Sequence, residues 1–580
     1  MGGEARALGE IGLEERLRRL ELVHRIGVAL AGQSRPEALV ETILLEAKKL
    51  CNADGGTLYL RSEDDAELGF AIVRNDSLGL TLGGTTGAPI DFPPVALHDA
   101  DGAENHQNVA SHALWKRDTV NIADAYDTEE FDFSGTKRFD AQNGYRSQSF
   151  LTIPMLGSSG RVIGVLQLIN AADPATGKVH AFPADDQHIV EALAAQAGVT
   201  LDNQLLIKAQ KELLESFIQL IAAAIDAKSP YTGGHCERVP LLTEMLAQAA
   251  CEADAGPFAS FGLDDDEWYE LRIAAWLHDC GKVVTPIHVM DKATKLEAIY
   301  DRIETVRARY GLLKQEAELQ WLRDGKQDDQ REAYEAKQAE LDEELAFLEK
   351  TNIGGEFLND EAKLRVRTIA KRTFPLGAER LPLLTWEEVA NLTISRGTLT
   401  DDERLTINGH MVQTISMLEA LPFPRNLRRV PEYAAGHHEK MDGGGYPKGI
   451  YAADMSVPAR IMAIADVFEA LTAQDRPYKK GKTLSESMRI MGFMKRDNHL
   501  DPELLDLFVS SGTYRAYGKQ WLPPELIDEV DEQAILDIEP RPYELPAQDE
   551  RRRRVESLLP EYEVMRTSVP THMTNPPDSE

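Results

Sequence analysis

The chain has 580 residues, 43% hydrophobic and 27% charged, so it is long enough for two or three domains with separate cores. Its 63 lysines and arginines stand against 96 aspartates and glutamates, a net charge of −33 that argues against binding to nucleic-acid phosphates or an anionic membrane surface. The four cysteines form no CxxC pair, which is typical of inert thiols in a reducing compartment. The N-terminus lacks a signal-peptide pattern and no apolar run approaches about 18 residues, so we expect a cytoplasmic protein without a membrane span.

The N-terminal part predicts a domain built on one antiparallel sheet. Residues 1–14 are expected to be a flexible N-terminus, and apolar residues from Leu13 to Leu30 recur at helical spacing. The segments GGTLYL, GFAIVRN, FLTIPML and RVIGVLQLIN are bounded by Gly, Asn, Asp and Ser, and they predict strands. A helix is expected to follow from about Asp185, so helices flank the sheet.

Residues 15–205 resemble a GAF domain, most closely the type found in cyclic-nucleotide phosphodiesterases. The stretch NIADAYDTEEFDFSGTKRFDAQNGYRSQSFLTIPM carries the likeness, as does QLIN followed by FPADDQ. Nucleotide-binding GAF domains usually have a Lys after the Asn of that strand and an acidic pair after the Phe. Here Asn170 precedes Ala171, and Phe182 leads to Asp186-Gln187, so the usual ion pair cannot form in its usual place. A cyclic nucleotide, another small ligand, and a dimerising role without ligand remain as alternatives.

Residues 185–228 predict one long helix, because the stretch has no Pro and a single Gly, Gly198. Residues 206–228 are expected to be a linker that acts as a signalling helix. Its apolar residues recur at alternating spacings of three and four, as Leu214, Phe217, Ile221 and Ala224. This pattern predicts a parallel helix pair across a homodimer. The alternative is a helix that packs only on its own domain.

Four motifs in the second half combine histidines with carboxylates. They are WLHDCGK, LTINGHMVQT, HHEKMDGGGYP and RIMAIADVFEAL. In an apolar helical pattern an unpaired ionisable group would be costly to bury, so these groups are expected to share partners. In the order HDCGK, GTLTDDERLTINGH, HHEKMDGGGYPKG and RIMAIAD followed by DRPYKK, they resemble the HD-GYP family. This family is a branch of the HD-domain phosphohydrolases that hydrolyses cyclic di-GMP.

The resemblance implies an all-α domain over residues 229–522 with two divalent metal ions. Asp279 is the expected bridging carboxylate. The other expected ligands are His278, His410, His437, His438 and Asp466, with His235 as a further candidate. Tyr231 stands where some members have a Glu that supports a third metal, so two ions are expected. Mixed His and carboxylate ligands suit iron or manganese, the family's more frequent metals, and ligand type alone also admits zinc.

The expected catalytic residues are Asp279 and Lys282. Lys282 lies one helical turn beyond His278, so it should face the same site and bind the scissile phosphate or protonate the leaving oxygen. By resemblance, Arg476 and Lys479 would bind the second phosphate and the guanine. The loop beside the site would be formed by Gly443, Gly444, Gly445, Tyr446 and Pro447. In the family this GYP segment is also proposed to touch diguanylate cyclase (GGDEF) domains.

Residues 291–395 interrupt the family pattern. Two apolar stripes, one from Leu296 to Leu313 and one from Tyr334 to Leu348, are separated by the polar turn RDGKQDD and predict an antiparallel helical hairpin. Such a hairpin would cover the site, bind a partner, dimerise, or form a solvated structural arm. Beyond residue 502 we expect one more helix. The tail, 523–580, is expected to be partly disordered, with Arg551–Arg554 folded back onto acidic surface.

The sequence thus predicts a multidomain protein with a GAF domain, a long helix and an all-α HD-GYP domain that carries an inserted helical hairpin. The expected function is metal-dependent hydrolysis of cyclic di-GMP to linear pGpG, GMP or both, regulated by the GAF domain in bacterial signalling. One alternative is an HD phosphohydrolase for another nucleotide, such as a mixed cyclic dinucleotide. The others are a non-catalytic cyclic di-GMP receptor or scaffold, and a protein that is mainly a GAF sensor.

Overall fold

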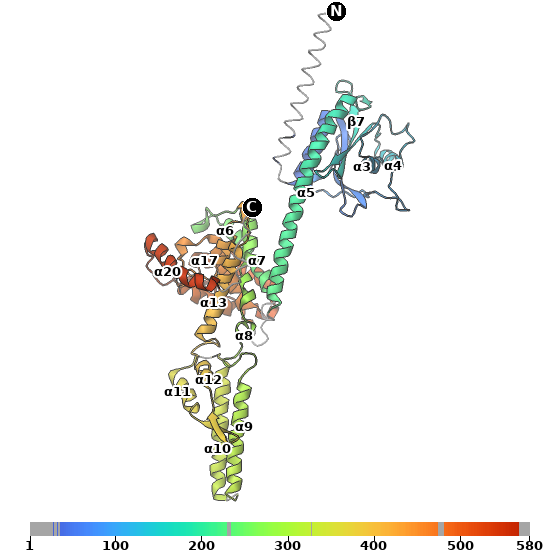
Figure 1. Ribbon diagram of the computed structural model, residues 1–580. Coiled ribbons are helices and arrows are strands. Elements are labelled where there is room, and N and C mark those ends of the chain that lie inside the picture. Colours follow the sequence, from blue (N-terminus) through green and yellow to red (C-terminus); the bar gives the residue numbers. More distant parts are fainter. Residues whose placement is uncertain are drawn as a thin grey trace, which may run out of the picture. The chain divides into compact units, whose positions relative to one another are not determined.

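The computed structural model describes Gly27, Gly32 and residues 35–228, 234–325, 328–355, 357–473 and 481–567. The chain divides into two compact units, Met1–Leu214 and Glu215–Glu580, whose elements are labelled in Figure 1. None of the described helices has both the length and the apolar character that crossing a bilayer requires. The helix predicted near residues 13–30 lies outside the described residues, apart from Gly27.

One antiparallel sheet forms the centre of the first unit. Its strands follow the order β3-β2-β1-β7-β6-β5, with β4 beside β2 and β8 beside β7. The central strands β1 and β7 pair from Ala53 opposite Ala171 to Leu60 opposite Gly164. The strands are β1 (Ala53–Arg61), β2 (Glu67–Asn75), β3 (Leu80–Gly83), β4 (Val95–Ala96), β5 (Val120–Ile122), β6 (Phe150–Leu156), β7 (Val162–Ala172) and β8 (Val179–His180).

Helices cover both faces of this sheet (Figure 1). The helix α2 (Pro36–Leu50) and the first part of α5 (Ala184–Asp226) bury apolar side chains such as Ile43 and Leu193 in one core with β1, β6 and β7. The helices α3 (Val109–Lys116) and α4 (Ser134–Asn143) lie on the other side, and η1 (Gly84–Thr86) follows β3. The antiparallel sheet flanked by helices confirms the fold predicted for the N-terminal domain, and the 43-residue α5 confirms the long helix.

The second unit is helical. Its main core joins apolar side chains from α6, α7, α14, α15, α16, α17 and α18, for example Leu246, Leu271, Ile461 and Phe508. Outside the inserted segment, the helices of this unit up to residue 521 are α6 (His235–Cys251), η2 (Gly256–Phe258), α7 (Asp265–Leu277), η3 (Cys280–Val284), α8 (Ile287–Met290), α13 (Asp401–Glu419), η4 (Arg425–Leu427), α14 (Val430–Ala435), η5 (Ala452–Asp454), α15 (Val457–Thr472), α16 (Leu484–Arg496), α17 (Pro502–Ser510) and α18 (Thr513–Trp521).

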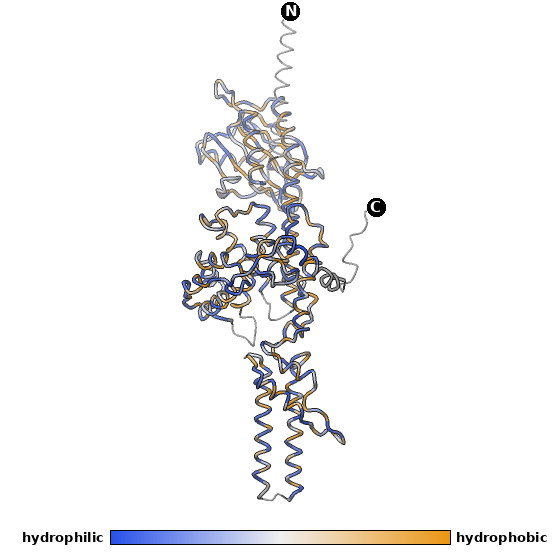
Figure 2. Tube along the Cα trace, turned by 90° about the vertical axis from the view of Figure 1, so that its left-hand side faces the viewer, coloured by the Kyte–Doolittle hydropathy of each residue, from blue (hydrophilic) through white to orange (hydrophobic). Residues whose placement is uncertain are grey.

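The interruption between α8 and α13 contains the predicted helical hairpin. The helices α9 (Ile303–Arg323) and α10 (Asp328–Asn352) bury Val306, Tyr310 and Leu348 between them. Hydrophilic and hydrophobic residues alternate along the pair, as expected for helices that bury one stripe each (Figure 2). The interruption also holds a second layer that we did not predict. It comprises α11 (Asp360–Ile369), the strand pair β9 (Thr373–Leu376) and β10 (Glu379–Pro382), and α12 (Trp386–Leu392).

The C-terminal part contains more helices than predicted. Two helices, α17 and α18, occupy the place of the single helix we expected, and they are followed by η6 (Pro524–Leu526), α19 (Glu532–Leu536) and α20 (Gln548–Thr567). The predicted return of the arginine run to acidic surface is confirmed for Arg551, whose Nε lies 2.7 Å from Oδ2 of Asp454. Residues 568–580 lie outside the described residues.

Candidate metal centre

The HD doublet stands at the end of a helix whose interior is buried. The helix α7 begins with a capping box between Asp264 and Glu267 and ends at Leu277. His278 is its C-cap residue, and Asp279 is the N-cap residue of the 3₁₀ helix η3. Burial of the apolar side of α7 carries both side chains into the protein. His278 is 0% exposed and Asp279 is 2% exposed. A carboxylate so deeply buried requires cationic partners.

The helix α13 brings His410 to the doublet. The turn η3 packs so closely on α13 that a Cβ placed on Gly281 would lie 2.0 Å from the carbonyl oxygen of His410. The backbone N–H of Gly281 also donates to Oγ1 of Thr414 at 2.9 Å. The glycine of the HDCGK motif therefore permits the contact that sets His410 beside Asp279.

The remaining predicted ligands come from three other segments. His437 and His438 follow the short helix α14, Asp466 lies in the middle of α15, and His235 is the first residue of α6. All four are buried or nearly so. Segments far apart in the sequence thus supply one polar cluster inside an apolar core.

The cluster divides into two groups that share one carboxylate. One group consists of Asp279, His410, His437 and His438, and the other of His235, His278, Asp279 and Asp466. Within each group, one ligand atom from each residue lies within 4.8 Å of all the others. Nε2 of His410 is 3.2 Å from Oδ1 of Asp279, whereas Nε2 of His278 is 3.2 Å from Oδ2. The two oxygens of Asp279 therefore face different groups.

Backbone contacts fix how the imidazoles are oriented. Nδ1 of His278 is 2.8 Å from the carbonyl oxygen of Ala275, and Nδ1 of His437 is 2.7 Å from that of Ala434. His410 makes the same contact with Ile407. Since a carbonyl only accepts, each Nδ1 carries the proton and leaves a lone pair on Nε2. These three Nε2 atoms are buried and form no hydrogen bond with any described residue, as expected for nitrogens that bind a metal ion.

The electrostatics of the cluster favour neutral imidazoles at His437 and His438 beside ionised carboxylates. Burial lowers the pKa of His235, but its hydrogen bonds to Asp279, Asp466 and Glu469 outweigh burial and raise this pKa well above its usual value. Burial lowers the pKa of His437 to about 4, and it lowers that of His438 well below its usual value. Burial raises the pKa of Asp279, but Lys282 and the nearby imidazoles outweigh it and hold the pKa well below the usual range. Neutral imidazole and carboxylate are the forms that ligate metal ions, so the donor set fits two divalent cations.

Glu469 and Arg238 belong to the site, although sequence reasoning missed them. Glu469 lies one turn after Asp466 on α15 and contacts Nδ1 of His235. Nε of Arg238 donates to Oε1 of Glu469 at 2.6 Å. A carboxylate bound to one ring nitrogen orients the imidazole so that its other nitrogen can bind a metal ion. The spacing of Asp466 and Glu469, which puts both on one helix face, could have indicated this role.

The glycine-rich loop closes against the second histidine of the pair. The ring of Tyr446 stacks on His438 with centroids 4.9 Å apart. Gly443 has φ 74°, and a Cβ on Gly445 would lie 2.4 Å from Cα of Glu439, so the loop requires glycine at both places. Gly444 donates its N–H to Asp442, and Pro447 follows Tyr446. Arg476 and Lys479 lie outside the described residues.

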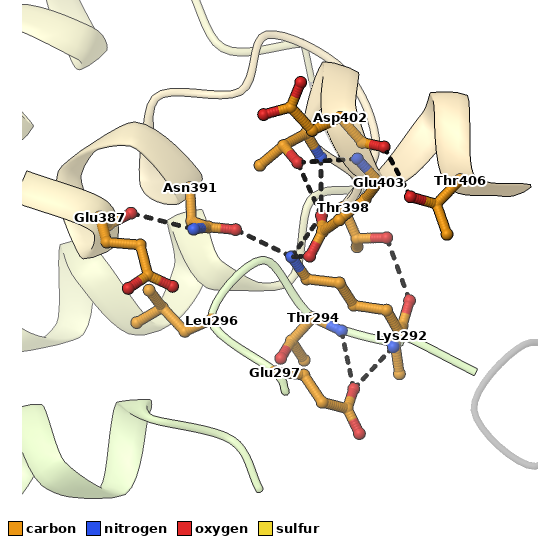
Figure 3. Close-up of polar contacts among 12 residues, drawn as sticks. Lys292, Thr294, Leu296, Glu297, Glu387, Asn391, Thr398, Asp402, Glu403 and Thr406 are labelled. Atoms are coloured by element: carbon orange, nitrogen blue, oxygen red, sulfur yellow. Dashed lines mark hydrogen bonds and ion pairs between the residues drawn. The ribbon is translucent and has the colours of Figure 1, made fainter. Parts of the chain in front are cut away.

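A buried ion pair connects the inserted helices to α13. Nζ of Lys292 lies 2.8 Å from Oδ1 of Asn391, on α12, and 2.8 Å from both carboxylate oxygens of Glu403 (Figure 3). Glu403 also completes the capping box of α13 with Thr400. The insertion is therefore bonded to the first turn of the helix that carries His410.

The first unit contains a cavity of about 540 Å³. Aromatic side chains line it together with polar ones; among them are Tyr59, Phe70, Phe92, Phe139, Phe150, Arg74, Asn75 and Gln167. The Arg74 guanidinium is already bonded to Glu41, at 2.6 Å, and to backbone carbonyls. Asn170, whose motif departs from the nucleotide-binding pattern, accepts the backbone N–H of Gln148 at 2.7 Å and shapes the adjacent loop.

Comparisons with known proteins agree with both units. Residues 35–201 match the model of the GAF domain, and residues 350–504 match that of an HD domain. The chain is 41% identical over 113 residues to 3'3'-cGAMP-specific phosphodiesterase 1 of Vibrio cholerae, which covers 20% of this chain and 25% of that one. It is 36% identical over 115 residues to the cyclic di-GMP phosphodiesterase PA4108 of Pseudomonas aeruginosa, covering 20% and 27%.

The matched segments therefore span about a quarter of the length of these two relatives. Among solved structures, the GAF domain of an Acinetobacter phosphoenolpyruvate-protein phosphotransferase is similar, with 15% identity, a TM-score of 0.25, and coverage of 33% of this chain and 98% of that one. The two domain matches, the motif order and the relatives agree. The chain combines a GAF domain with an HD domain of the HD-GYP type.

Proposed function

We propose that this protein is a metal-dependent phosphodiesterase that hydrolyses a cyclic dinucleotide, with cyclic di-GMP as the leading substrate. The observation that carries the proposal is the pair of ligand groups sharing Asp279. A carboxylate that faces two cation sites is the arrangement by which hydrolases place two ions on one phosphate. The relatives named as cyclic di-GMP and 3'3'-cGAMP phosphodiesterases support the substrate class.

Each residue has a definite task in this proposal. Asp279 would be shared by the two ions; His410, His437 and His438 would hold one of them, and His235, His278 and Asp466 would hold the other. When bound, the ions would neutralise the phosphate and supply an activated water. Lys282, whose Nζ bonds to Asp279, places a positive charge where the phosphodiester would lie. His and carboxylate ligands favour iron or manganese, and they also admit zinc.

A second substrate is favoured by a specific observation. The 41% identical relative is named for 3'3'-cGAMP, and its match is stronger in identity than that of the cyclic di-GMP enzyme. Both substrates present the same phosphodiester to the metal ions, so the ligands do not distinguish them. A receptor or scaffold that binds without turnover would have no need of a complete ligand set.

Regulation by the first unit is the second part of the proposal. The GAF cavity combines aromatic walls with amide side chains, and its Arg74 is already engaged by Glu41. This chemistry suits an uncharged planar ligand better than a phosphate, which would need a free cation. We keep cyclic nucleotides as the weaker candidates for this cavity.

Homodimer formation through α5 is the third part. Leu213, Leu214, Phe217, Leu220 and Ile221 are all at least 40% exposed on this helix. Large apolar side chains at three- and four-residue spacing are stabilised by a second helix, and a parallel copy of α5 would cover them. A GGDEF-domain partner at the GYP loop remains a prediction from resemblance.

The deciding experiment is turnover by protein purified without air, with bound metal counted in the same sample. Cyclic di-GMP, 3'3'-cGAMP and cyclic di-AMP are each offered, and the linear dinucleotide and mononucleotide products are separated by chromatography. Two metals per chain with steady release of pGpG or GMP would establish the enzyme and its product. Bound metal without turnover of any of the three would contradict the substrate class, and absence of metal would favour the receptor.

A further inference from the structure

The C-terminal end of α5 contacts the HD turn through one lysine. Nζ of Lys228 donates to three backbone carbonyls, those of Lys282 (3.1 Å), Val283 and Thr285 (2.7 Å). An ammonium group has three donors, so these acceptors use all of them. The carbonyls of Lys282 and Val283 belong to the end of η3, and that of Thr285 follows it. The carbonyl of Lys282 also accepts the backbone N–H of Thr285 at 3.1 Å.

The same end of α5 contacts the segment that carries His235. Oδ2 of Asp226 accepts the backbone N–H of Cys236 at 3.1 Å, in the first turn of α6. Asp226 is only 7% exposed, and burial raises its pKa. Two side chains of α5's last turn and the residues that follow it therefore bind two different ligand-bearing segments, one beside His235 and one beside Asp279.

The turn η3 is fixed on its other side as well. Gly281 lies against α13, where its N–H bonds to Thr414 and where no Cβ would fit. The turn η3 is therefore not a loose loop, and a displacement of Lys228 moves the residues of this turn. Since Gly281 holds the turn to α13, such a displacement changes the position of Asp279, which precedes the turn, and of Lys282, which lies in it, relative to His235 on α6.

We infer that Asp226 and Lys228 are positioning residues that set the geometry of the ligand group formed by His235, His278, Asp279 and Asp466. The inference rests on the proposed metal-dependent function. It assigns the regulation of that function to the contacts of Asp226 with α6 and of Lys228 with η3. Since α5 is also the last helix of the GAF unit, a change in α5 reaches the metal ligands through two side chains. Neither residue belongs to either ligand group.

Manganese binding by the full-length, metal-free chain tests the inference. Lys228→Met keeps the length of the side chain and removes all three donors, whereas Lys228→Arg keeps donors for the carbonyls. Removal of groups that orient metal ligands typically weakens metal binding by about 10–100-fold. We expect Lys228→Met to weaken the binding of one of the two Mn²⁺ ions by about tenfold or more and to leave the affinity for the other unchanged. It should also lower kcat with little change in KM.

Matched variants separate positioning from general damage. Lys208→Met removes an exposed lysine from the same helix and should leave both Mn²⁺ affinities at the wild-type value. Lys228→Arg should keep most of the wild-type affinity for Mn²⁺. Asp226→Ala should weaken the binding of the same Mn²⁺ ion that Lys228→Met affects. If Lys228→Met does not fold, as judged by circular dichroism, Lys228→Gln replaces it in the titration.

The outcomes distinguish the two proposals. Wild-type protein that binds no Mn²⁺ would overturn the proposed function and this inference together. Wild-type protein that binds two ions, with Lys228→Met and Asp226→Ala binding them equally well, would overturn the inference alone. Equal weakening of both ions in Lys228→Met and no rescue by Lys228→Arg would also overturn it, because a merely structural role predicts that result.

Discussion

Nζ of Lys282 donates a hydrogen bond to Oδ2 of Asp279, the carboxylate that both ligand groups share. Burial lowers the pKa of Lys282, but Asp279 and Asp466 outweigh it and raise the pKa to about 12. An acid with so high a pKa gives up its proton poorly at neutral pH. We therefore expect Lys282 to act as a fixed positive charge at the phosphate and not as the donor of the leaving group's proton.

We predict that Lys282→Met lowers kcat by about 10²–10³-fold, because the loss of one preformed charge at a transition state has this size. Lys282→Arg should keep a large part of the rate, since the guanidinium group carries the same positive charge and does not release a proton at neutral pH. Steady-state kinetics on the preferred cyclic dinucleotide, with metal content measured for each variant, decide the matter. An inactive Lys282→Arg with normal metal content would show that proton transfer, and not charge, is the task of this side chain.

Asp279 and Asp466 should differ in how many ions their loss removes. Asp279 belongs to both ligand groups, whereas Asp466 belongs only to the group with His235 and His278. We predict that Asp279→Ala retains neither ion and has no measurable turnover, while Asp466→Ala retains about one ion per chain, in accord with the role of a bridging carboxylate. Metal analysis of purified variants gives the counts, and the melting of the first unit serves as the folding control.

An Asp279→Ala variant that keeps two ions and normal turnover would remove the shared carboxylate from the mechanism. A variant of Asp466 that loses both ions would instead mean that the two groups form only together. The two counts therefore report on separate features of the centre.

The sequence predicted the ligand set but not the residues that orient it. Histidines and aspartates inside apolar helical patterns indicated a shared polar site, and the resemblance to the HD-GYP family implied the ligand set. Lys228 contacts a turn 54 residues away, and no local pattern reveals such a contact. Glu469 could have been predicted from helical spacing, because it lies one turn after Asp466 on the same helix. The return of Arg551 to acidic surface was predicted and is confirmed by its contact with Asp454, whereas the stacking of Tyr543 near Tyr451 could not be predicted because it forms only in the folded chain.

The helix α20 should influence the glycine-rich loop through Arg554. Its guanidinium donates to the carbonyl oxygen of Gly443 at 2.8 Å and to the hydroxyl of Tyr451 at 2.7 Å. We predict that Arg554→Ala raises KM about fivefold with kcat nearly unchanged, because an intramolecular hydrogen bond contributes about 1 kcal/mol to the loop that lies beside the substrate. Kinetics under the same metal loading measure the effect.

Arg553→Ala is the matched control, since this neighbouring arginine is exposed. The control should leave KM at the wild-type value. An equal change in both variants would mean that the charge of α20, and not the contact with Gly443, governs substrate binding.

The buried ammonium of Lys292 should be among the strongest links between the insertion and the HD core. Its side chain is 1% exposed and binds Glu403, whose own side chain is 26% exposed, together with Asn391. Lys292→Met leaves Glu403 without its cation and weakens the capping box of α13. Removing one partner of a buried pair costs about 3 kcal/mol, so we predict a loss of this size in the free energy of unfolding of the second unit.

Denaturant unfolding followed by the signal of the second unit measures the loss. Lys337→Ala is the control, because Lys337 and Glu340 form an exposed pair one helical turn apart, and its loss should cost less than about 1 kcal/mol. The double variant Lys292→Met/Glu403→Gln should recover part of the stability, since no buried charge is then left without a partner. A loss for Lys292→Met no larger than the control would mean that the apolar core of the insertion, and not this ion pair, fixes it to α13.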